Sequence, residues 1–137
     1  MTQEERHLLL KDICARLPYG VKVHLDTDDK SFDTDLVGLP NNNTVNIHDK
    51  ENYETIEECF VWNIKPYLHP MSSMTEEERE EFRMIGGVTS YSPQHNTWAI
   101  CAFSPEAYDW LLANHFDHRG LIEKGLALEA PEGMYLA

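Results

Sequence analysis

An extended segment with two prolines, followed at once by a strong helix start, lies at the centre of this chain in residues 64–78. Pro66 and Pro70 lack a backbone N–H, and each disfavours helical backbone in the residue before it. Thr75, with Glu78 three residues later, then forms a capping box, and the glutamates that follow Thr75 suit the positive end of a helix dipole. The pattern predicts a linker that joins a strand to a helix beginning near Thr75. It locates a junction in the fold and indicates no reaction.

One amphipathic helix and several half-buried strands are predicted before this junction. Thr2 and Glu5 form a first capping box, and apolar residues then recur at helical spacing as far as Leu17, which predicts a helix over residues 2–17. Apolar and polar residues alternate further along, as they do in strands with one buried face. The predicted strands are residues 21–25, 36–39, 45–47 and 56–62, with polar turns at 26–35 and 40–43.

Two helices and a hairpin are predicted after the junction. Gly86 and Gly87 end the first helix, residues 88–103 form a short hairpin, and Ser104 caps a helix over residues 105–115. Asp117 is placed to cap a turn that runs to residue 125, and an irregular tail follows. The fold class predicted for residues 1–137 is therefore α+β, a single globular domain in which a small antiparallel meander packs against two or three helices.

Composition limits the environment and the partners that we expect. The chain has 137 residues and a net charge of −13, which disfavours direct binding to nucleic acid. No apolar run is long enough for a membrane span, and the polar start does not resemble a secretory signal, so we expect a cytoplasmic protein with no membrane contact. Cys14, Cys59 and Cys101 are widely spaced, which favours free thiols over disulfides or a zinc site.

Metal-ligand side chains cluster locally at His115, Asp117 and His118. Imidazoles and a carboxylate can bind zinc, but this spacing matches no established metal motif. The alternative is structural: His115 closes a helix, where the dipole favours a partly positive imidazole, and Asp117 caps the next turn. We favour the structural roles and expect no metal and no cofactor. The aspartates of residues 26–35 are interpreted as a solvated turn, because Lys30 and Ser31 occupy positions that a calcium loop gives to other residues.

Other chemistries have weaker support. No serine lies in a Gly-x-Ser-x-Gly elbow, and Gly86-Gly87 lacks the lysine of a phosphate-binding loop, so no catalytic residue is predicted. Trp62, Tyr67 and the two prolines near them would suit a peptide groove, although such a set more often forms the edge of a core.

Three parts of the chain resemble a family of small uncharacterised proteins of gut Bacteroides-type genomes and their mobile elements. The resemblance covers Leu17–Val23, the segment KPYLHPMSSMTEEE at residues 65–78, and the segments at 108–111 and 115–135 that include DWL, HFDHRGLI and GLALEAPEGMY. His69 stands where the family pattern has arginine and His118 where it has tyrosine, which argues against a histidine-based site shared by the family. The resemblance implies no assigned activity.

These observations favour a non-catalytic binding or regulatory accessory protein whose partner is another protein. A small metal-dependent, hydrolase-like enzyme using His115, Asp117 and His118 is one alternative. The other is an acidic decoy of a nucleic-acid-binding protein, because carboxylates gather in three groups at residues 26–35, 49–58 and 76–81. We expect these groups to be dispersed, since they fall in a turn, around a strand and in a helix.

Overall fold

Strands and helices share this molecule in an α+β arrangement, as the sequence predicts. The computed structural model describes residues 1–49, 56–92, 97–102 and 104–135. Its helices are α1 (Gln3–Arg16), α2 (Glu76–Met84) and α3 (Pro105–Ala113). Its strands are β1 (Lys22–Asp26), β2 (Ser31–Gly38), β3 (Thr44–His48), β4 (Ile56–Phe60), β5 (Ile64–Pro70), β6 (Val88–Ser92), β7 (Thr97–Ala102), β8 (Phe116–Asp117) and β9 (Leu128–Glu129). The described strands outnumber those that the sequence predicts.

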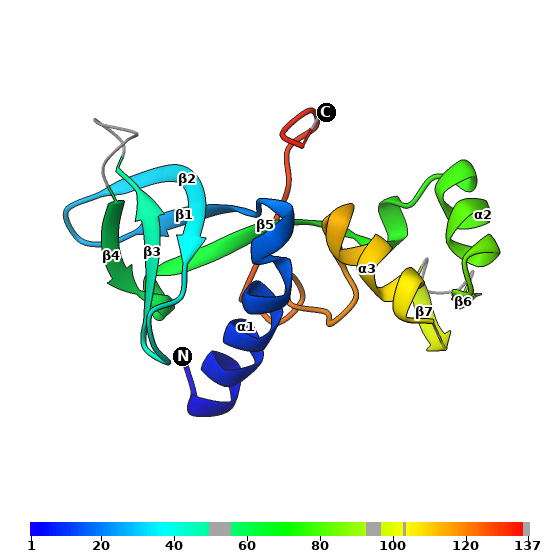
Figure 1. Ribbon diagram of the computed structural model, residues 1–137, viewed down its shortest axis with the longest axis horizontal. Coiled ribbons are helices and arrows are strands. Elements are labelled where there is room, and N and C mark those ends of the chain that lie inside the picture. Colours follow the sequence, from blue (N-terminus) through cyan, green and yellow to red (C-terminus); the bar gives the residue numbers. More distant parts are fainter. Residues whose placement is uncertain (50–55, 93–96, 103, 136–137) are drawn as a thin grey trace.

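The main sheet is built on an antiparallel meander (Figure 1). Its strand order is β4-β3-β2-β1-β5-β8, and the two-residue strands β8 and β9 both pair with β5 in parallel. The sheet curls: Lys30, in the turn between β1 and β2, lies 2.6 Å from the carboxylate of Glu57 in β4, although two strands separate β1 from β4 in the sheet. The curl brings the β1–β2 turn and strand β4 to opposite sides of one hollow.

Alternation along the strands gives the sheet a buried inner face and an open outer face. On the inner face, Val23 and Leu25 of β1 pack in one cluster with Leu9 and Ile13 of α1, all at most 1% exposed. The same cluster takes in residues from β2, β3 and the segment after β8, namely Phe32, Leu36, Val45, Ile47, Leu121, Leu126 and Ala127. The outer-face residues of β1 and β2 are polar and carry the side chains described below.

The proline-containing segment forms a strand within the sheet, so the prediction of a linker is wrong. Pro66 of β5 pairs with Val23 of β1, and the residues of β5 after Pro66 pair with the parallel strands β9 and β8. Those parallel pairings begin at Tyr67, so the missing N–H of Pro66 falls outside the positions that they use. The helix start after it is confirmed, because Thr75 and Glu78 cap α2 reciprocally.

Two further sequence predictions need correction, and several are confirmed. Strand β2 begins at Ser31 and not at Leu36, because Phe32 and Thr34 continue the inward-facing alternation into the acidic segment. Strands β8 and β9 were not predicted, since each is too short to show a period. The predicted α1, with its Thr2 cap, is confirmed, as are α3 and the β6–β7 hairpin.

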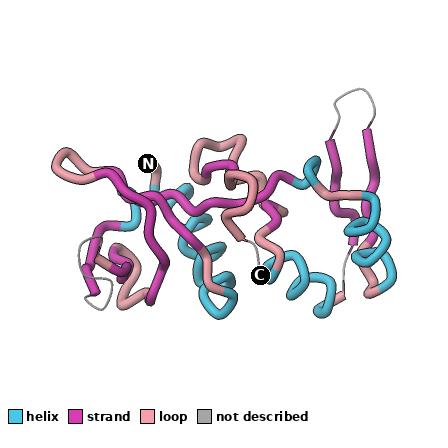
Figure 2. The backbone as a smooth tube through the Cα atoms, turned by 90° about the horizontal axis from the view of Figure 1, so that it is seen from above, coloured by secondary structure: helices cyan, strands magenta, loops and turns pink. Residues whose placement is uncertain are grey.

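The segment from α2 to α3 lies at the other end of the molecule from the meander (Figure 2), and a second, smaller core is formed there. It consists of Met71, Met74, Phe82, Ala107, Leu111 and Phe116. The chain leaves the sheet at Pro70, forms α2, β6, β7 and α3, and returns at Phe116 beside its point of departure. The two ends meet because His69 pairs with Phe116 and the N–H of His69 donates to the carbonyl of His115 over 2.7 Å.

Candidate functional site on the open face of the sheet

A chain of hydrogen-bonded side chains crosses the outer face of β1, β2 and β5. His24 of β1 lies directly opposite Asp33 of β2, and its Nδ1 atom is 2.8 Å from the Asp33 Oδ1 atom. On the other side of the imidazole, His24 Nε2 is 3.2 Å from the hydroxyl oxygen of Ser31. The hydroxyl of Tyr67 in β5 donates to the same Asp33 oxygen over 2.7 Å. Serine, histidine and aspartate are thus joined in the order of a nucleophile, a base and an orienting carboxylate.

The electrostatics of this cluster fix the direction of its hydrogen bonds. Partial burial alone would raise the pKa of Asp33, but hydrogen bonds from Tyr67 and His24 outweigh it and hold that pKa below its usual value. Burial and the hydrogen bond to Asp33 raise the pKa of Tyr67 to about 12, so this phenol remains a donor. An ionised Asp33 accepts a hydrogen bond from the Nδ1–H of His24, which leaves Nε2 of the neutral imidazole as the acceptor for the Ser31 hydroxyl.

Strand β4 presents a second feature, an apolar edge. β4 ends the strand order, and among the described residues no strand pairs with its other edge. Ile56, Phe60 and Trp62 are 54%, 49% and 43% exposed. The rings of Phe60 and Trp62 stack with centroids 4.5 Å apart and planes 8° from parallel. The sequence placed Ile56, Phe60 and Trp62 on one face but did not show that this face points outward.

A hollow of about 400 Å³ runs beside β4. One side is formed by Thr27, Asp29 and Lys30 of the β1–β2 turn, and the other by residues 57–60 of β4. Burial, together with neighbouring carboxylates, raises the pKa of the Cys59 thiol in this hollow to about 11, so the thiol is protonated and a poor nucleophile. The hollow is therefore better suited to binding a ligand than to reaction at the Cys59 thiol.

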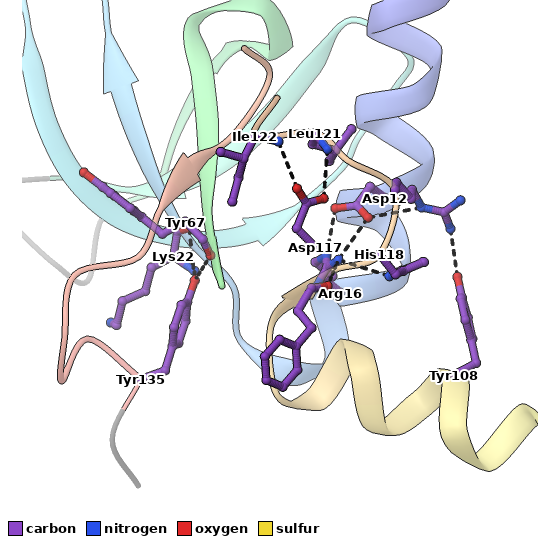
Figure 3. A network of polar contacts seen from close by, with 12 residues as sticks. Asp12, Arg16, Lys22, Tyr67, Tyr108, Asp117, His118, Leu121, Ile122 and Tyr135 are labelled. Carbon is purple, nitrogen blue, oxygen red and sulfur yellow. Dashed lines mark hydrogen bonds and ion pairs between the residues drawn. The ribbon is translucent and has the colours of Figure 1, made fainter. Parts of the chain in front are cut away.

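The sequence-predicted candidates His115, Asp117 and His118 lie elsewhere, at the seam between Phe116 of the smaller core and Leu121 of the larger core. Figure 3 shows Asp117 and His118 in this region. Both carboxylate oxygens of Asp117 accept backbone N–H groups, from Leu121 and Ile122, each over 2.9 Å. Asp117 therefore caps the following turn, as predicted. Its carboxylate already serves two donors, which weakens its use as a metal ligand.

The two histidines of this cluster face different neighbours. His115 follows the end of α3 in the left-handed conformation, with φ at 62°, and stacks on Tyr135 with ring centroids 3.6 Å apart. Burial and then the charge of Arg16 lower its pKa to about 4, so the expectation of a partly positive imidazole is wrong. His118 lies edge-on to Tyr108, and burial followed by Arg16 and Arg119 lowers its pKa to about 4 as well.

A buried ion pair, missed in the sequence, holds this seam together. Arg16 and Asp12 of α1 have fully buried side chains and are joined by a bond of 2.7 Å from Nε to Oδ2. Arg16 also donates to the carbonyl of Phe116 over 2.6 Å, and Arg119 donates to Asp12 over 3.1 Å. Arg119 also donates a hydrogen bond to the hydroxyl of Tyr108. The only signal in the sequence was an Asp and an Arg four residues apart inside an apolar helix stripe.

The carboxylate groups are distributed in two places. The residues 26–35 group and the described members of the 49–58 group lie at the β-sheet end, whereas the 76–81 group lies on α2 at the far end (Figure 1). The group at residues 76–81 is thus separate from the other two, as expected, whereas the groups at residues 26–35 and 49–58 lie at the same end of the molecule. In the described ranges no three His, Cys, Asp or Glu side chains are arranged to hold a metal ion.

Comparison with known proteins identifies no relative: no protein-family model, curated protein or solved structure matches this chain. In the part of the chain that the structure describes, every helix is too short or too polar to pass through a lipid bilayer.

Proposed function

We propose that this chain is an accessory protein that binds an extended, basic segment of another protein as an added strand along β4. The observation that carries the proposal is the stacked pair Phe60–Trp62, in which Phe60 ends the edge strand β4 and Trp62 lies in the 3₁₀ turn Val61–Asn63 that follows it. Soluble proteins usually protect such edges with lysine, proline or a covering loop, and β4 (Ile-Glu-Glu-Cys-Phe) contains neither lysine nor proline. An edge strand that pairs with no other described strand on one side and carries apolar side chains is the arrangement used when a peptide adds a strand to a sheet.

Charge supports the choice of a basic segment. Glu58 shares the outer face of β4 with Ile56 and Phe60, and Asp29 lies across the hollow. Glu57 is already paired with Lys30, so the remaining carboxylates give the edge an acidic character. An incoming strand would place backbone groups against β4, apolar side chains against Phe60 and Trp62, and lysine or arginine toward Glu58 and Asp29.

The structure gives unequal support to the cytoplasmic location, the acidic decoy and the metal-dependent enzyme. The described thiols Cys14 and Cys59 are free, which supports the proposal of a cytoplasmic location. The acidic decoy remains a second candidate, supported by the two carboxylate groups at the β-sheet end; it differs in that its partner would be a nucleic-acid-binding protein. The metal-dependent enzyme has no support from the geometry of Asp117.

A selection from random displayed dodecapeptides tests the proposal. We expect the protein to enrich peptides that alternate basic with β-branched or aromatic residues, with binding that weakens as salt rises. The variant Phe60→Ser, Trp62→Ser should lose this binding, whereas Met84→Ser, at a side chain 78% exposed on α2, should retain it. Thermal unfolding of each variant verifies that it is folded. Equal binding by the native chain and the Phe60→Ser, Trp62→Ser variant would contradict the proposal.

A further inference from the structure

We propose that Ser31 is a nucleophile, activated by His24 and oriented through Asp33, that takes an acyl group from small esters. The proposal is independent of strand addition along β4, because it uses the outer face of β1, β2 and β5. Two observations support it: the unbroken order of contacts and the exposure of the hydroxyl.

The order of contacts is the one that nucleophile activation requires. A base must lie within hydrogen-bond reach of the hydroxyl, and a third group must hold the base in the right tautomer. His24 Nε2 is 3.2 Å from Ser31 Oγ, and His24 Nδ1 is 2.8 Å from Asp33 Oδ1. Tyr67 donates to Asp33 and packs edge-on to His24, with ring centroids 6.4 Å apart. The imidazole is thus held from two sides.

The strand register explains this arrangement. His24 and Asp33 are directly opposed across the β1–β2 pair, and Ser31 is opposed to Asp26, two residues from His24 on the same face. Lys65 of β5 is opposed to His24 on the other side, so its side chain leaves the sheet from the same face. Ser31 is exposed, so an ester can approach the hydroxyl from solvent.

The reaction balances with these groups alone. The Ser31 oxygen bonds to the carbonyl carbon of the ester while its proton moves to His24 Nε2. The bond to the leaving alkoxide then breaks, and the alkoxide takes that proton and departs as an alcohol. Water attacks the acyl-serine with His24 again as base, which releases a carboxylic acid and restores the hydroxyl.

A fluorophosphonate probe tests the first step, because Ser31 would bond to phosphorus while fluoride leaves. Intact mass and peptide mapping should place one adduct on Ser31, and none on Ser73, whose hydroxyl donates to a backbone carbonyl. Ser31→Ala should abolish the adduct, and His24→Gln should slow labelling roughly tenfold or more. Both substitutions are at the surface, and thermal unfolding verifies that the variants are folded.

Two further measurements separate activation from mere exposure. In the native chain, ¹⁵N shifts of His24 should report the proton on Nδ1, and Asp33→Asn should disturb that tautomer and slow labelling. The native chain should also release nitrophenol from p-nitrophenyl acetate faster than Ser31→Ala does. Labelling spread over several serines, or a labelling rate unchanged by His24→Gln, would overturn the proposal.

Discussion

Replacing Arg16 with methionine should destabilise the protein more than any exposed ion pair could. The change removes the two bonds from Arg16 to Asp12 and the bond to the carbonyl of Phe116, all in surroundings where the side chains of Arg16 and Asp12 are 0% exposed. Asp12 then loses its main partner and keeps the contact from Arg119. Removing one member of a buried pair typically costs about 3–5 kcal/mol, because a charge remains without compensation. A domain is stable by only about 5–15 kcal/mol, so this loss is large.

Urea unfolding at neutral pH measures the effect, with Arg83→Met as the matched control. Arg83 pairs with Glu80 on α2, but the two side chains are 71% and 56% exposed, so its loss should change the free energy of unfolding by less than about 1 kcal/mol. The double variant Asp12→Leu, Arg16→Met should recover part of the loss, since the buried carboxylate goes with its partner and Arg119, 17% exposed, can turn to solvent. If Arg16→Met loses no more stability than Arg83→Met, the buried pair does not hold the seam.

Three further changes have defined outcomes. Thr75→Ala removes the cap of α2 and should cost about 1 kcal/mol in denaturant melts, whereas Glu81→Ala in the same helix should cost much less. The pKa values of His115 and His118 are lowered to about 4, so the unfolded chain binds more protons than the folded chain between about pH 6.5 and 4. As the pH is lowered through this window, the free energy of unfolding should decrease by up to about 1.4 kcal/mol per pH unit for each histidine. The variant His115→Phe should show a smaller decrease in urea unfolding measured across this pH range. Zinc or calcium should leave the melting temperature unchanged; a rise abolished by His115→Ala, His118→Ala would show that a metal binds there.

Local signals in the sequence predicted much of this fold. The caps of α1, α2 and α3 are read from residues within one helical turn, so Thr2, Thr75 and Ser104 could be identified correctly. Asp117 was likewise identified as a cap, because its donors lie four and five residues away. β5 was missed because proline normally disfavours a paired strand, and its place between β1 and the C-terminal strands depends on distant parts of the chain.

The candidate site was less accessible from sequence for a geometric reason. His24, Ser31 and Asp33 are seven and two residues apart along the chain, and only the register of β1 with β2 brings them together. Treating residues 26–35 as a turn hid this register, since β2 in fact begins at Ser31. A hairpin read from Val23 and Leu25 against Phe32 and Thr34 would have placed His24 opposite Asp33.

The meeting of His69 with Phe116 has a consequence for the order of folding. The meander from β1 to β4 joins neighbours in sequence and closes only short loops, so it can form early. The pairing of β5 with β8 must instead close the long segment that holds α2, β6, β7 and α3. Folding of that segment around Phe82 and Leu111 brings its own ends together, which lowers the entropy lost at closure. We therefore expect the smaller core to form before β8 pairs with β5.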